Sequence, residues 1–388
     1  MGGLKKRLTE ILGILSVLVF QMKLRRMLSK SINLSGEFVY IWIPPRLDEN
    51  LGDLGMATVF EESFKDQKVI YISNNSSILN FKTLNKTVYF NHQKDQRNLF
   101  ACISQYQPKR LIIVGADTLD GAYGAVESIF KLSTALNFQT SSIQSYLVNV
   151  SWNAKKLNLL LKLILTLTSK VGAKFLVRDV VSFSRLESKG VNSVLSADLV
   201  FNLKPKPRYP LKESFEDWKS QNRPIVAVGF GVPLDQDPNY FEQMVEVCRY
   251  LLSNSYAIVL SPSGSSKSDL DLNFALLSSL NNERVFYYQN ISSSYEFVEL
   301  LSTADFGITN RMHFVIHALL VHVPSIGVEY QGKFEGLYDF LTMRAFNLQS
   351  LFEISSTIGP FVEELQISKR KIAKSLPHLI ELSRKNFS

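Results

Sequence analysis

Two basic side chains of different chemistry, Arg311 and His313, stand two residues apart in the segment Ala304–His313. The apolar residues ahead of them predict a buried strand that ends at Thr309–Asn310, and either of these two residues can cap a helix that begins at Arg311. Both basic side chains are therefore expected in a first helical turn, where free N–H groups and the helix dipole favour an anion. One interpretation is a phosphate or carboxylate site. The other is that Arg311 pairs with a local acid and His313 is a buried, hydrogen-bonded histidine.

His317 lies four residues after His313, a spacing that suits a metal ion on one helix face. No carboxylate stands beside the two histidines as a base, however, and apolar residues surround His317. The favoured interpretation is a core histidine, and no metal is expected.

A second charged pair, Arg178 and Asp179, follows the apolar run Lys174–Val177 and precedes a predicted helix. This order puts the pair at the carboxyl end of a strand, where open α/β folds bind ligands. The alternative is a surface ion pair of little energetic consequence.

Two loops that follow predicted strands contain carboxylates. In Asn50–Gly55, Asp53 stands between two glycines that permit a close backbone approach. In Val114–Gly121, Asp117 and Asp120 are candidates for acid/base groups, for acceptors of sugar hydroxyls, or for ordinary loop residues. Neither loop carries a dinucleotide-binding or Walker pattern.

Short β-branched runs alternate with helical stretches along most of the chain. In the first half we expect strands at Phe38–Ile43, Lys68–Ser73, Val88–Phe90, Arg110–Val114, Lys174–Val177 and Leu199–Phe201. The alternation restarts at Ile225–Val228 and continues to Ser325–Val328. The predicted fold class is α/β, with two Rossmann-like doubly wound domains that face a cleft between the carboxyl ends of their parallel sheets.

The proline- and charge-rich segment 204–223 predicts a linker between the two halves. The expected organisation is a basic amphipathic N-terminal segment (1–36), an N-terminal Rossmann-like domain (37–203), the linker (204–223), a C-terminal Rossmann-like domain that carries Arg311 and His313 (224–345), and a C-terminal helical segment (346–388).

Composition and charge exclude several classes of protein. With 46% hydrophobic and 20% charged residues in 388, the chain is too apolar for disorder and too polar for an integral membrane bundle. The net charge of +8 arises mostly from residues 1–36, which carry seven basic residues and one acidic residue. Because the remainder is nearly neutral, no nucleic-acid partner is expected. Two cysteines are too few for a disulfide framework, which indicates a reducing, cytoplasmic compartment.

The basic N-terminal segment has an apolar centre, Ile11–Phe20, about half as long as a membrane-spanning helix. No cleavage site for a secretory signal follows it. Two interpretations remain open for residues 1–30. The helix lies on an anionic membrane surface, so that the protein is peripheral on the inner face of the membrane, or it packs on its own domain. A second helix, Lys155–Ser169, is expected to be amphipathic because lysines surround its leucines.

Taken in chain order, these segments resemble the polysaccharide pyruvyl transferase family. The resemblance runs from about residue 37 to residue 340 and is strongest over 311–336. The segments that carry it are Gly52–Asp53, Val114–Gly115, Val177–Asp179 with Ser182, Ala197–Asp198, Arg311–His313 and Tyr330–Lys333.

The resemblance implies a fold similar to the GT-B glycosyltransferases. It also implies transfer of the pyruvyl group of phosphoenolpyruvate onto a sugar of a polysaccharide or lipid-linked glycan precursor, as a ketal and without a cofactor. By position in the motifs, Arg311 and His313 inherit catalytic roles, Arg178 inherits donor binding, and Lys333 inherits a weaker donor contact. Asp53, Asp117 and Asn310 complete the expected substrate-binding set.

The chemistry of this donor agrees with the residues. Phosphoenolpyruvate carries a phosphate and a carboxylate, so its site requires several fixed cations, and guanidinium groups bind both anions in a bidentate manner. His313 is suited to protonate the enol carbon, and Arg311 and Arg178 to stabilise the departing phosphate.

Two other functions remain open. One is a nucleotide-sugar glycosyltransferase of similar fold, in which Glu329 or Glu335 would hold a ribose. The other is a non-catalytic protein that keeps the fold.

Overall fold

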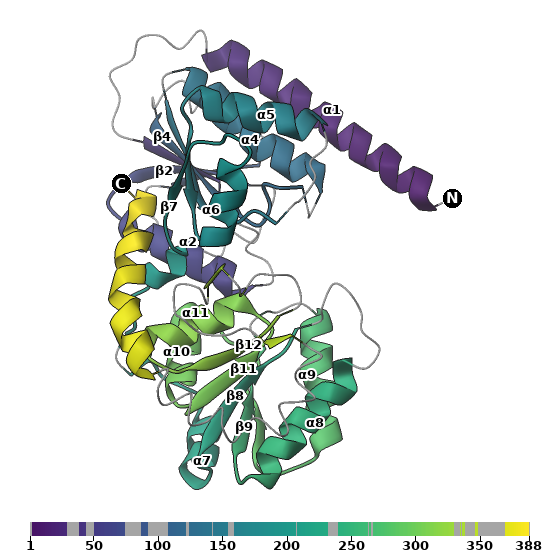
Figure 1. Cartoon of the computed structure of the whole chain (residues 1–388), viewed down its shortest axis with the longest axis vertical. Helices are drawn as coiled ribbons and strands as arrows, with labels where there is room; N and C mark the ends of the chain where they lie inside the picture. The colour runs from purple at the N-terminus through teal and green to yellow at the C-terminus, as the bar shows by residue number, and fades with distance from the viewer. Residues whose placement is uncertain are drawn as a thin grey trace. The chain divides into compact units, whose positions relative to one another are not determined.

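The structure is a computed structural model of the 388-residue chain (Figure 1). It describes residues 2–28, 39–43, 50–73, 87–91, 108–121, 124–141, 143–153, 159–206, 208–231, 240–262, 264, 267–329, 334, 336–337, 346–347 and 369–387. The chain divides into two compact units, and each is described by itself. Unit 1 consists of Met1–Leu47, Phe60–Asp198 and Arg384–Ser388, and unit 2 consists of Asp48–Val59 and Leu199–Ser383.

The described strands of unit 1 form a seven-stranded parallel sheet in the order β3-β2-β1-β4-β5-β6-β7. Its strands are β1 (Val39–Ile43), β2 (Lys68–Ser73), β3 (Thr87–Asn91), β4 (Pro108–Ala116), β5 (Gln144–Val150), β6 (Lys174–Val177) and β7 (Ser193–Leu195). The chain order reverses direction between β1 and β4, and such a reversal is where doubly wound sheets bind ligands.

The sequence pattern located most of these strands but not all of them. It did not predict β5 or β7, because polar residues interrupt β5 and β7 is only three residues long. The predicted strand at Leu199–Phe201 is instead the 3₁₀ helix η2 (Leu199–Asn202), in which all three apolar side chains are buried without a partner strand. A short apolar run indicates burial more reliably than it indicates a strand.

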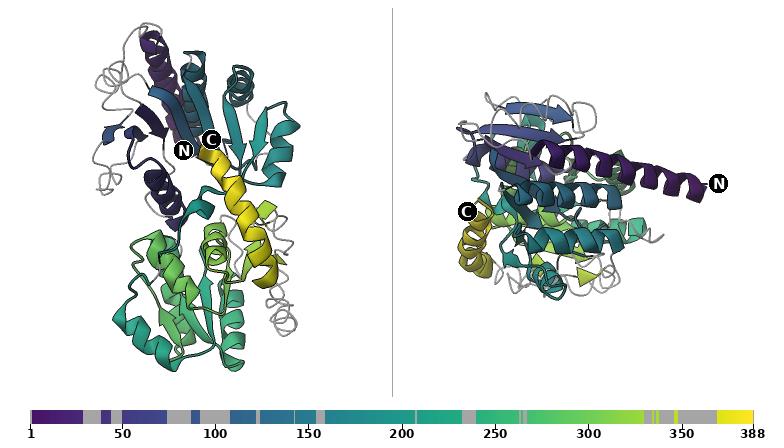
Figure 2. Two further views of the ribbon diagram at one scale, coloured as in Figure 1. Left: turned by 90° about the vertical axis from the view of Figure 1, so that its left-hand side faces the viewer. Right: turned by 90° about the horizontal axis from the view of Figure 1, so that it is seen from above.

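Helices of unit 1 are α1 (Gly2–Leu28), the last four residues of α2 (Leu51–Ser63), α4 (Ala125–Thr140), α5 (Leu159–Lys170) and α6 (Val180–Glu187). Helix α4 packs against both α1 and α5, so that the three lie side by side (Figure 2). The core beneath them contains Phe138, Leu147 and Phe175, each fully buried.

Helix α1 is part of this core. Val17, Phe20, Leu24 and Leu28 on one side of the helix are buried in the unit 1 cluster. Gln21 adds hydrogen bonds to α4, donating from Nε2 to Thr134 Oγ1 at 2.7 Å. Of the two interpretations of the N-terminal segment, packing on its own domain therefore holds for this side of the helix.

The described strands of unit 2 form a six-stranded parallel sheet in the order β10-β9-β8-β11-β12-β13. The strands are β8 (Ile225–Gly229), β9 (Ala257–Leu260), β10 (Val285–Tyr287), β11 (Phe306–Thr309), β12 (Ser325–Glu329) and β13 (Phe346–Asn347). The helices are α7 (Glu213–Gln221), α8 (Tyr240–Ser253), α9 (Lys267–Leu280), α10 (Ser294–Ser302) and α11 (Met312–Leu320). Every residue of β8, β9 and β11 is buried, as expected for central parallel strands.

Apolar clusters cover both faces of the unit 2 sheet. One involves α8 and α9, and the other involves α7, α10, α11 and the start of α2. The segment predicted as a linker, 204–223, includes α7, whose Phe215 is fully buried against Trp218, Phe286 and Tyr288. This part of the segment is an integral element of unit 2.

Two helices contain residues of both units. In α2 the division falls between Val59 and Phe60, and in the last helix, residues 369–384, it falls between Ser383 and Arg384. The beginning of α2 lies where the sequence predicted a loop. Asn50 caps this helix, because its Oδ1 accepts the Gly52 N–H at 2.9 Å.

Candidate functional site

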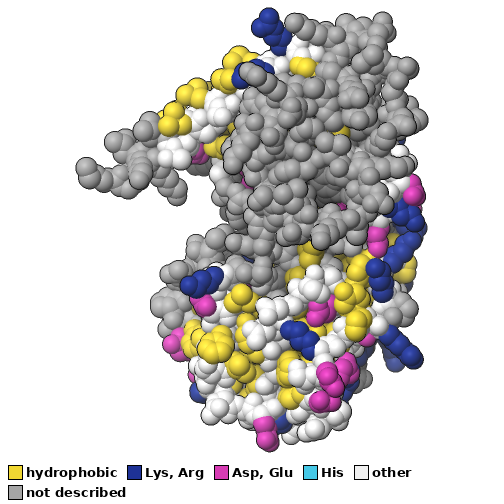
Figure 3. Space-filling model, turned by 180° about the vertical axis from the view of Figure 1, so that it is seen from behind, with side chains coloured by type: hydrophobic (Ala, Val, Ile, Leu, Met, Phe, Trp, Pro, Cys, Tyr) yellow, Lys and Arg dark blue, Asp and Glu magenta, His cyan; other side chains and the backbone are white. Residues whose placement is uncertain are grey.

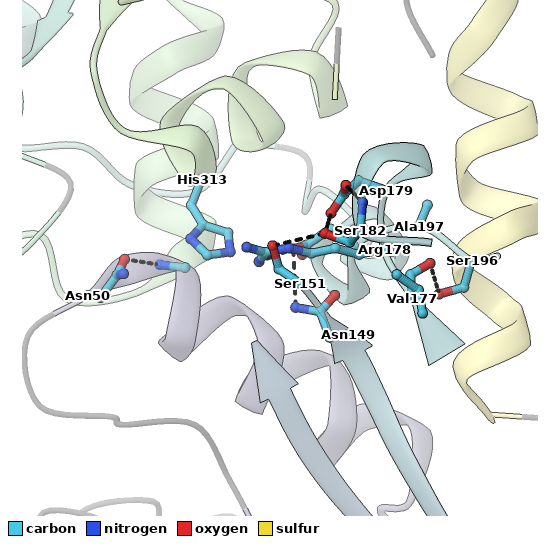
Figure 4. A network of polar contacts seen from close by, with 12 residues as sticks. Asn50, Asn149, Ser151, Val177, Arg178, Asp179, Ser182, Ser196, Ala197 and His313 are labelled. Carbon is cyan, nitrogen blue, oxygen red and sulfur yellow. Dashed lines mark hydrogen bonds and ion pairs between the residues drawn. The ribbon is translucent and has the colours of Figure 1, made fainter. Parts of the chain in front are cut away.

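Arg178 immediately follows β6, at the carboxyl end of that strand. Its backbone N–H donates to the Val150 carbonyl of β5 at 2.9 Å, and only 7% of the residue is exposed. The side chain donates from Nη1 to Asp198 Oδ2 at 3.1 Å (Figure 4). The alternative of a surface ion pair between Arg178 and Asp179 does not hold, because Arg178 is buried and the carboxylate that it binds stands twenty residues later.

A bulge in β5 provides a second contact to the Asp198 carboxylate. The register against β6 shifts between Leu147 and Val150, and Asn149 adopts a left-handed φ of 56°. Such a bulge redirects a side chain out of the regular ladder. Asn149 Nδ2 then donates to Asp198 Oδ2 at 3.1 Å. We call Arg178, Asp198 and Asn149 the Arg178 cluster.

Neighbouring carboxylates favour the charged form of the Arg178 guanidinium. Burial alone would lower the pKa of its guanidinium, but the carboxylates of Asp198, Asp117 and Asp179 outweigh burial and raise the pKa above its ordinary value. Asp117, one of the two carboxylates in the loop Val114–Gly121, therefore helps to keep Arg178 charged. Asp120 is structural, since its Oδ2 accepts the Asn153 N–H at 2.7 Å.

Asp179 caps helix α6. Its Oδ1 accepts the Ser182 N–H and its Oδ2 accepts the Ser182 hydroxyl, both at 2.7 Å. Ser182 Oγ in turn accepts the Trp152 N–H at 2.8 Å, so the cap is tied to the end of β5. Asp179 and Ser182 thus orient the turn from which Arg178 extends.

Asn386, in the 3₁₀ helix η3 (Lys385–Phe387), joins the two segments of the Arg178 cluster. Its Oδ1 accepts the Asn149 N–H at 3.2 Å, and its Nδ2 donates to the Ala197 carbonyl at 3.0 Å. The sequence gives no local signal for this role.

In unit 2, Arg311 and His313 lie at the carboxyl end of β11, as predicted, but the helix begins one residue later than expected. Arg311 is the N-cap residue of α11, with an extended backbone, and His313 is in the first turn. Arg311 Nη2 donates to both carboxylate oxygens of Asp269 in α9, at 2.7 and 2.6 Å. The pairing with an acid that the sequence left open is thus present, although 31% of the Arg311 side chain stays exposed.

Asn310 does not cap the helix; it binds the loop that follows β8. Its Oδ1 accepts the Gly231 N–H at 2.8 Å, and its Nδ2 donates to the Gly231 carbonyl at 2.7 Å and to Tyr240 Oη at 2.6 Å. A Cβ on Gly231 would lie 2.0 Å from Arg311 Nε, so the glycine leaves room for the guanidinium. Asn310 is a buried residue that shapes the surroundings of Arg311.

The imidazole of His313 lies against the start of α2. A Cβ on Gly52 would stand 2.1 Å from His313 Cγ, and one on Gly55 would stand 3.2 Å from His317 Nε2. The glycines that the sequence analysis identified for a close approach therefore contact the two histidines of α11. Asp53 lies between these glycines, in the first turn of α2.

His317 is a core residue, as expected. It is fully buried, its Nδ1 lies 2.6 Å from the His313 carbonyl oxygen, and its ring meets Phe297 edge-on. Lys333, predicted to contact the donor, lies outside the described residues, as does Glu335. Among the described residues there is no group of three or more His, Cys, Asp or Glu that could hold a metal ion.

The two carboxylates that bind the arginines were not predicted to have a role. Asp269 pairs with Arg311 across 42 residues and Asp198 pairs with Arg178 across 20, so no local spacing reveals either pair. The only available signal was that Asp198 stands in one of the segments that resemble the family.

Both sites have a common design. In each, an arginine at the carboxyl end of a parallel strand donates to a carboxylate, which orients the guanidinium. An oriented cation of this kind suits the recognition of phosphate or carboxylate. A helix N-terminus and an imidazole add to this arrangement at α11.

Solved structures with the same architecture share little sequence with this chain. A UDP-N-acetylglucosamine 2-epimerase from Listeria monocytogenes, described as putative, is 12% identical with a TM-score of 0.60, and the match covers 90% of this chain and 94% of that one. A glycosyltransferase from Rickettsia africae is 12% identical with a TM-score of 0.58, covering 91% and 100%. A Neisseria meningitidis UDP-GlcNAc 2-epimerase bound to UDP-GlcNAc is 10% identical with a TM-score of 0.58, covering 90% and 99%.

These likenesses and the two doubly wound units define a GT-B-like α/β protein, which confirms the predicted fold class. The sequence profile of the polysaccharide pyruvyl transferase family matches residues 50–332, most of the chain. The chain belongs to that family, and the resemblance found from its motifs is confirmed. Among curated protein sequences, no significant match was found.

Proposed function

We propose that the protein transfers the pyruvyl group of phosphoenolpyruvate onto a sugar of a polysaccharide or lipid-linked glycan precursor, as a cyclic ketal. Membership of the family supports pyruvyl transfer. The observation that supports this donor is the pair of basic side chains at the start of α11, a helix with no acidic residue in its first turn. A guanidinium, an imidazole and a helix N-terminus together favour a small acid with more than one negative charge.

Arg311 would bind the phosphate of the donor while Asp269 keeps its guanidinium in place. His313 would be the general acid, because it stands in the first turn of α11 next to Arg311 and an imidazole can transfer a proton. Arg178 is proposed to have a role in donor binding, by its position in the family's motif. Its raised pKa keeps it charged at any pH at which the enzyme works.

The proposed reaction has four steps. A proton from His313 adds to C3 of phosphoenolpyruvate, which becomes a methyl group and leaves oxocarbenium character at C2. A sugar hydroxyl bonds to C2 and loses its proton, and the bond from C2 to the phosphate oxygen then breaks. A second hydroxyl of the same sugar bonds to C2 and loses its proton. Of the two protons that the hydroxyls release, one restores His313 and the other goes to the departing phosphate. The products are the ketal and inorganic phosphate, and no cofactor enters this balance.

Asp53, Asp117, Asn310 and Lys333 are the remaining candidates for substrate binding. Asp53 and Asp117, both half-buried, are proposed to accept hydrogen bonds from acceptor hydroxyls. Asn310 would act indirectly, through the loop that it binds next to Arg311. An acceptor of this kind is made inside the cell, so we place the enzyme in the cytoplasm, at the inner face of the membrane when the acceptor is lipid-linked.

The test is phosphate release from phosphoenolpyruvate in the presence of glycan acceptors. We expect His313→Ala to lower kcat by about 10²–10⁴-fold, the usual contribution of a general acid. Arg311→Lys keeps the charge but loses the planar fork, and should raise KM for phosphoenolpyruvate. Arg249→Ala, which removes an exposed arginine of α8, is the control and should leave both constants unchanged.

Two results would overturn the proposal. One is hydrolysis or transfer from a nucleotide sugar with no release of phosphate from phosphoenolpyruvate, which would establish a glycosyltransferase. The other is full activity in the His313→Ala and Arg311→Lys variants, which would place the chemistry elsewhere.

A further inference from the structure

The outward sides of α1 and α5 are apolar where solvent-facing helices usually carry polar residues. Eleven large hydrophobic side chains are exposed among the described residues, and nine of them are on these two helices of unit 1. They are Ile11, Leu12, Leu15, Val19 and Met22 on α1, and Leu159, Leu160, Leu163 and Leu167 on α5. An exposed apolar surface of this extent marks a site of interaction.

The spacing forms a single row on each helix. On α1 the exposed residues recur at intervals that keep them on one side, opposite to Phe20 and Leu24, which are buried in the core. On α5, Leu159, Leu163 and Leu167 recur every four residues, opposite to the buried Leu161 and Leu165. The predicted helix is present, and its exposed side carries leucines as well as Lys162 and Lys170.

The two rows belong to one layer of helices. Helix α4 packs against both α1 and α5, and the three run side by side (Figure 2). Since the inner sides of α1 and α5 are buried in the same cluster, both rows point away from it. We call the two rows together the apolar face. Figure 3 shows its α1 part from behind, as apolar side chains that follow one another along the helix, with Lys and Arg side chains near them.

Basic residues accompany the apolar face. Helices α1 and α5 together contain eight Lys or Arg residues and one acid, Glu10. Arg26 and Lys170 continue the two apolar rows at the C-terminal ends of their helices, and both are exposed. This excess of positive charge favours a partner with a negatively charged surface and an apolar interior.

We infer that the apolar face docks unit 1 onto an anionic lipid bilayer, with both helices lying in the plane of the interface. Leucine, isoleucine, valine and methionine side chains enter the boundary between head groups and acyl chains, and the lysines and arginines contact lipid phosphates. Two interpretations of α1 followed from the sequence, binding to a membrane surface and packing on its own domain. One side of the helix packs on the domain, and we assign the other side to the bilayer. Helix α5 belongs to the same docking surface. This inference does not depend on the proposed donor or reaction.

The test is sedimentation of the full-length protein with vesicles of phosphatidylcholine alone or of phosphatidylcholine and phosphatidylglycerol in a 3:1 ratio. We expect binding to the anionic vesicles, which decreases with salt. The double variant Leu15→Gln/Leu163→Gln should bind at least about tenfold more weakly, because two half-exposed leucines lose their burial in lipid. The matched control is Phe274→Gln on α9, an exposed apolar residue of unit 2, which should bind like the wild type.

A charge variant separates the two contributions. Arg26→Ala/Lys170→Ala should weaken binding to anionic vesicles by about tenfold and leave binding to phosphatidylcholine unchanged, as expected for lost contacts to lipid phosphates. Because all four residues are exposed, the variants should fold, and their Tm should lie within a degree or two of the wild type.

Two outcomes would overturn the inference. If wild-type protein does not bind anionic vesicles, the face has another role. If Leu15→Gln/Leu163→Gln instead converts a dimer into a monomer in sedimentation velocity, and vesicle binding is unaffected, the face covers a second copy of this chain. Neither outcome involves phosphoenolpyruvate, so failure here is distinguishable from failure of the proposed function.

Discussion

Glycine is required at position 52 because an imidazole occupies the space where a side chain would begin. The close approach of a glycine was predictable from the sequence. Its partner, His313, was not, since the two stand more than 250 residues apart and only the packing of α2 into unit 2 brings them together. The segment Asn50–Gly55, predicted as a loop, is helical from Leu51 onward because it packs into unit 2. Two glycines lower helix propensity, but contacts with α10 and α11 outweigh that preference.

We expect Gly52→Ala to lower both stability and activity. Alanine in a helix is usually about 1 kcal/mol more favourable than glycine, so a clash-free site would gain stability. A Cβ 2.1 Å from His313 Cγ must instead displace the imidazole or the helix. We predict a loss of about 1–3 kcal/mol in urea denaturation and a fall of at least tenfold in kcat.

Glu62→Ala, at an exposed position of the same helix, is the control for this substitution and should change neither quantity. A Gly52→Ala protein that is more stable than the wild type and fully active would contradict the contact.

The Arg178 cluster is assembled by elements that are individually unremarkable in sequence. Strand β6 and the arginine that follows it were predicted, because three consecutive apolar residues before a charged pair indicate the end of a buried strand. The neighbouring β5 was not, since alternation fails where Asn149 forms the bulge. The bulge that weakens the sequence signal is the feature that directs Asn149 to Asp198.

Removing the charge of Asp198 should be far more costly than removing a surface carboxylate. Asp198→Asn keeps the shape but leaves the buried Arg178 without its nearest counter-charge, and we predict a loss of about 3–5 kcal/mol in the free energy of unfolding. Asp217→Asn, on the exposed side of α7, should stay within about 0.5 kcal/mol of the wild type. Equal effects of the two variants in chemical denaturation would refute the buried pair.

At the scale of the whole chain, the alternation of strands and helices was sufficient to predict two parallel α/β units. In unit 2 the strands predicted at Ile225–Val228 and Ser325–Val328 agree with β8 and β12 to within one residue at each end. The assignment of segments to units was harder to predict. Residues 48–59 belong to unit 2 and residues 384–388 to unit 1, far from their neighbours in sequence, because tertiary contacts and not chain order define a unit.

Helix α1 should behave as part of unit 1 and not as a detachable tail. Phe20→Ala removes a buried ring that packs against Phe130, and we predict a loss of about 3–5 kcal/mol. Met22→Ala, on the exposed side, should cost less than about 0.5 kcal/mol. Amide hydrogen exchange provides the measurement, and faster exchange should appear in the strands and helices of unit 1. An unchanged exchange pattern in Phe20→Ala would mean that α1 is only loosely attached.

The contacts of Asn386 have a consequence for the order in which the protein matures. Asn386 is 189 residues beyond Ala197, whose carbonyl it binds, and all of unit 2 from Leu199 onward is synthesised between them. Strands β1 to β7 can leave the ribosome and pair early. The segments that carry the Arg178 cluster, however, acquire their hydrogen bonds to Asn386 only after unit 2 has emerged. A nascent polypeptide that is halted before residue 386 would therefore contain strands β1 to β7 and still lack the Asn386 contacts that join the two segments of the Arg178 cluster.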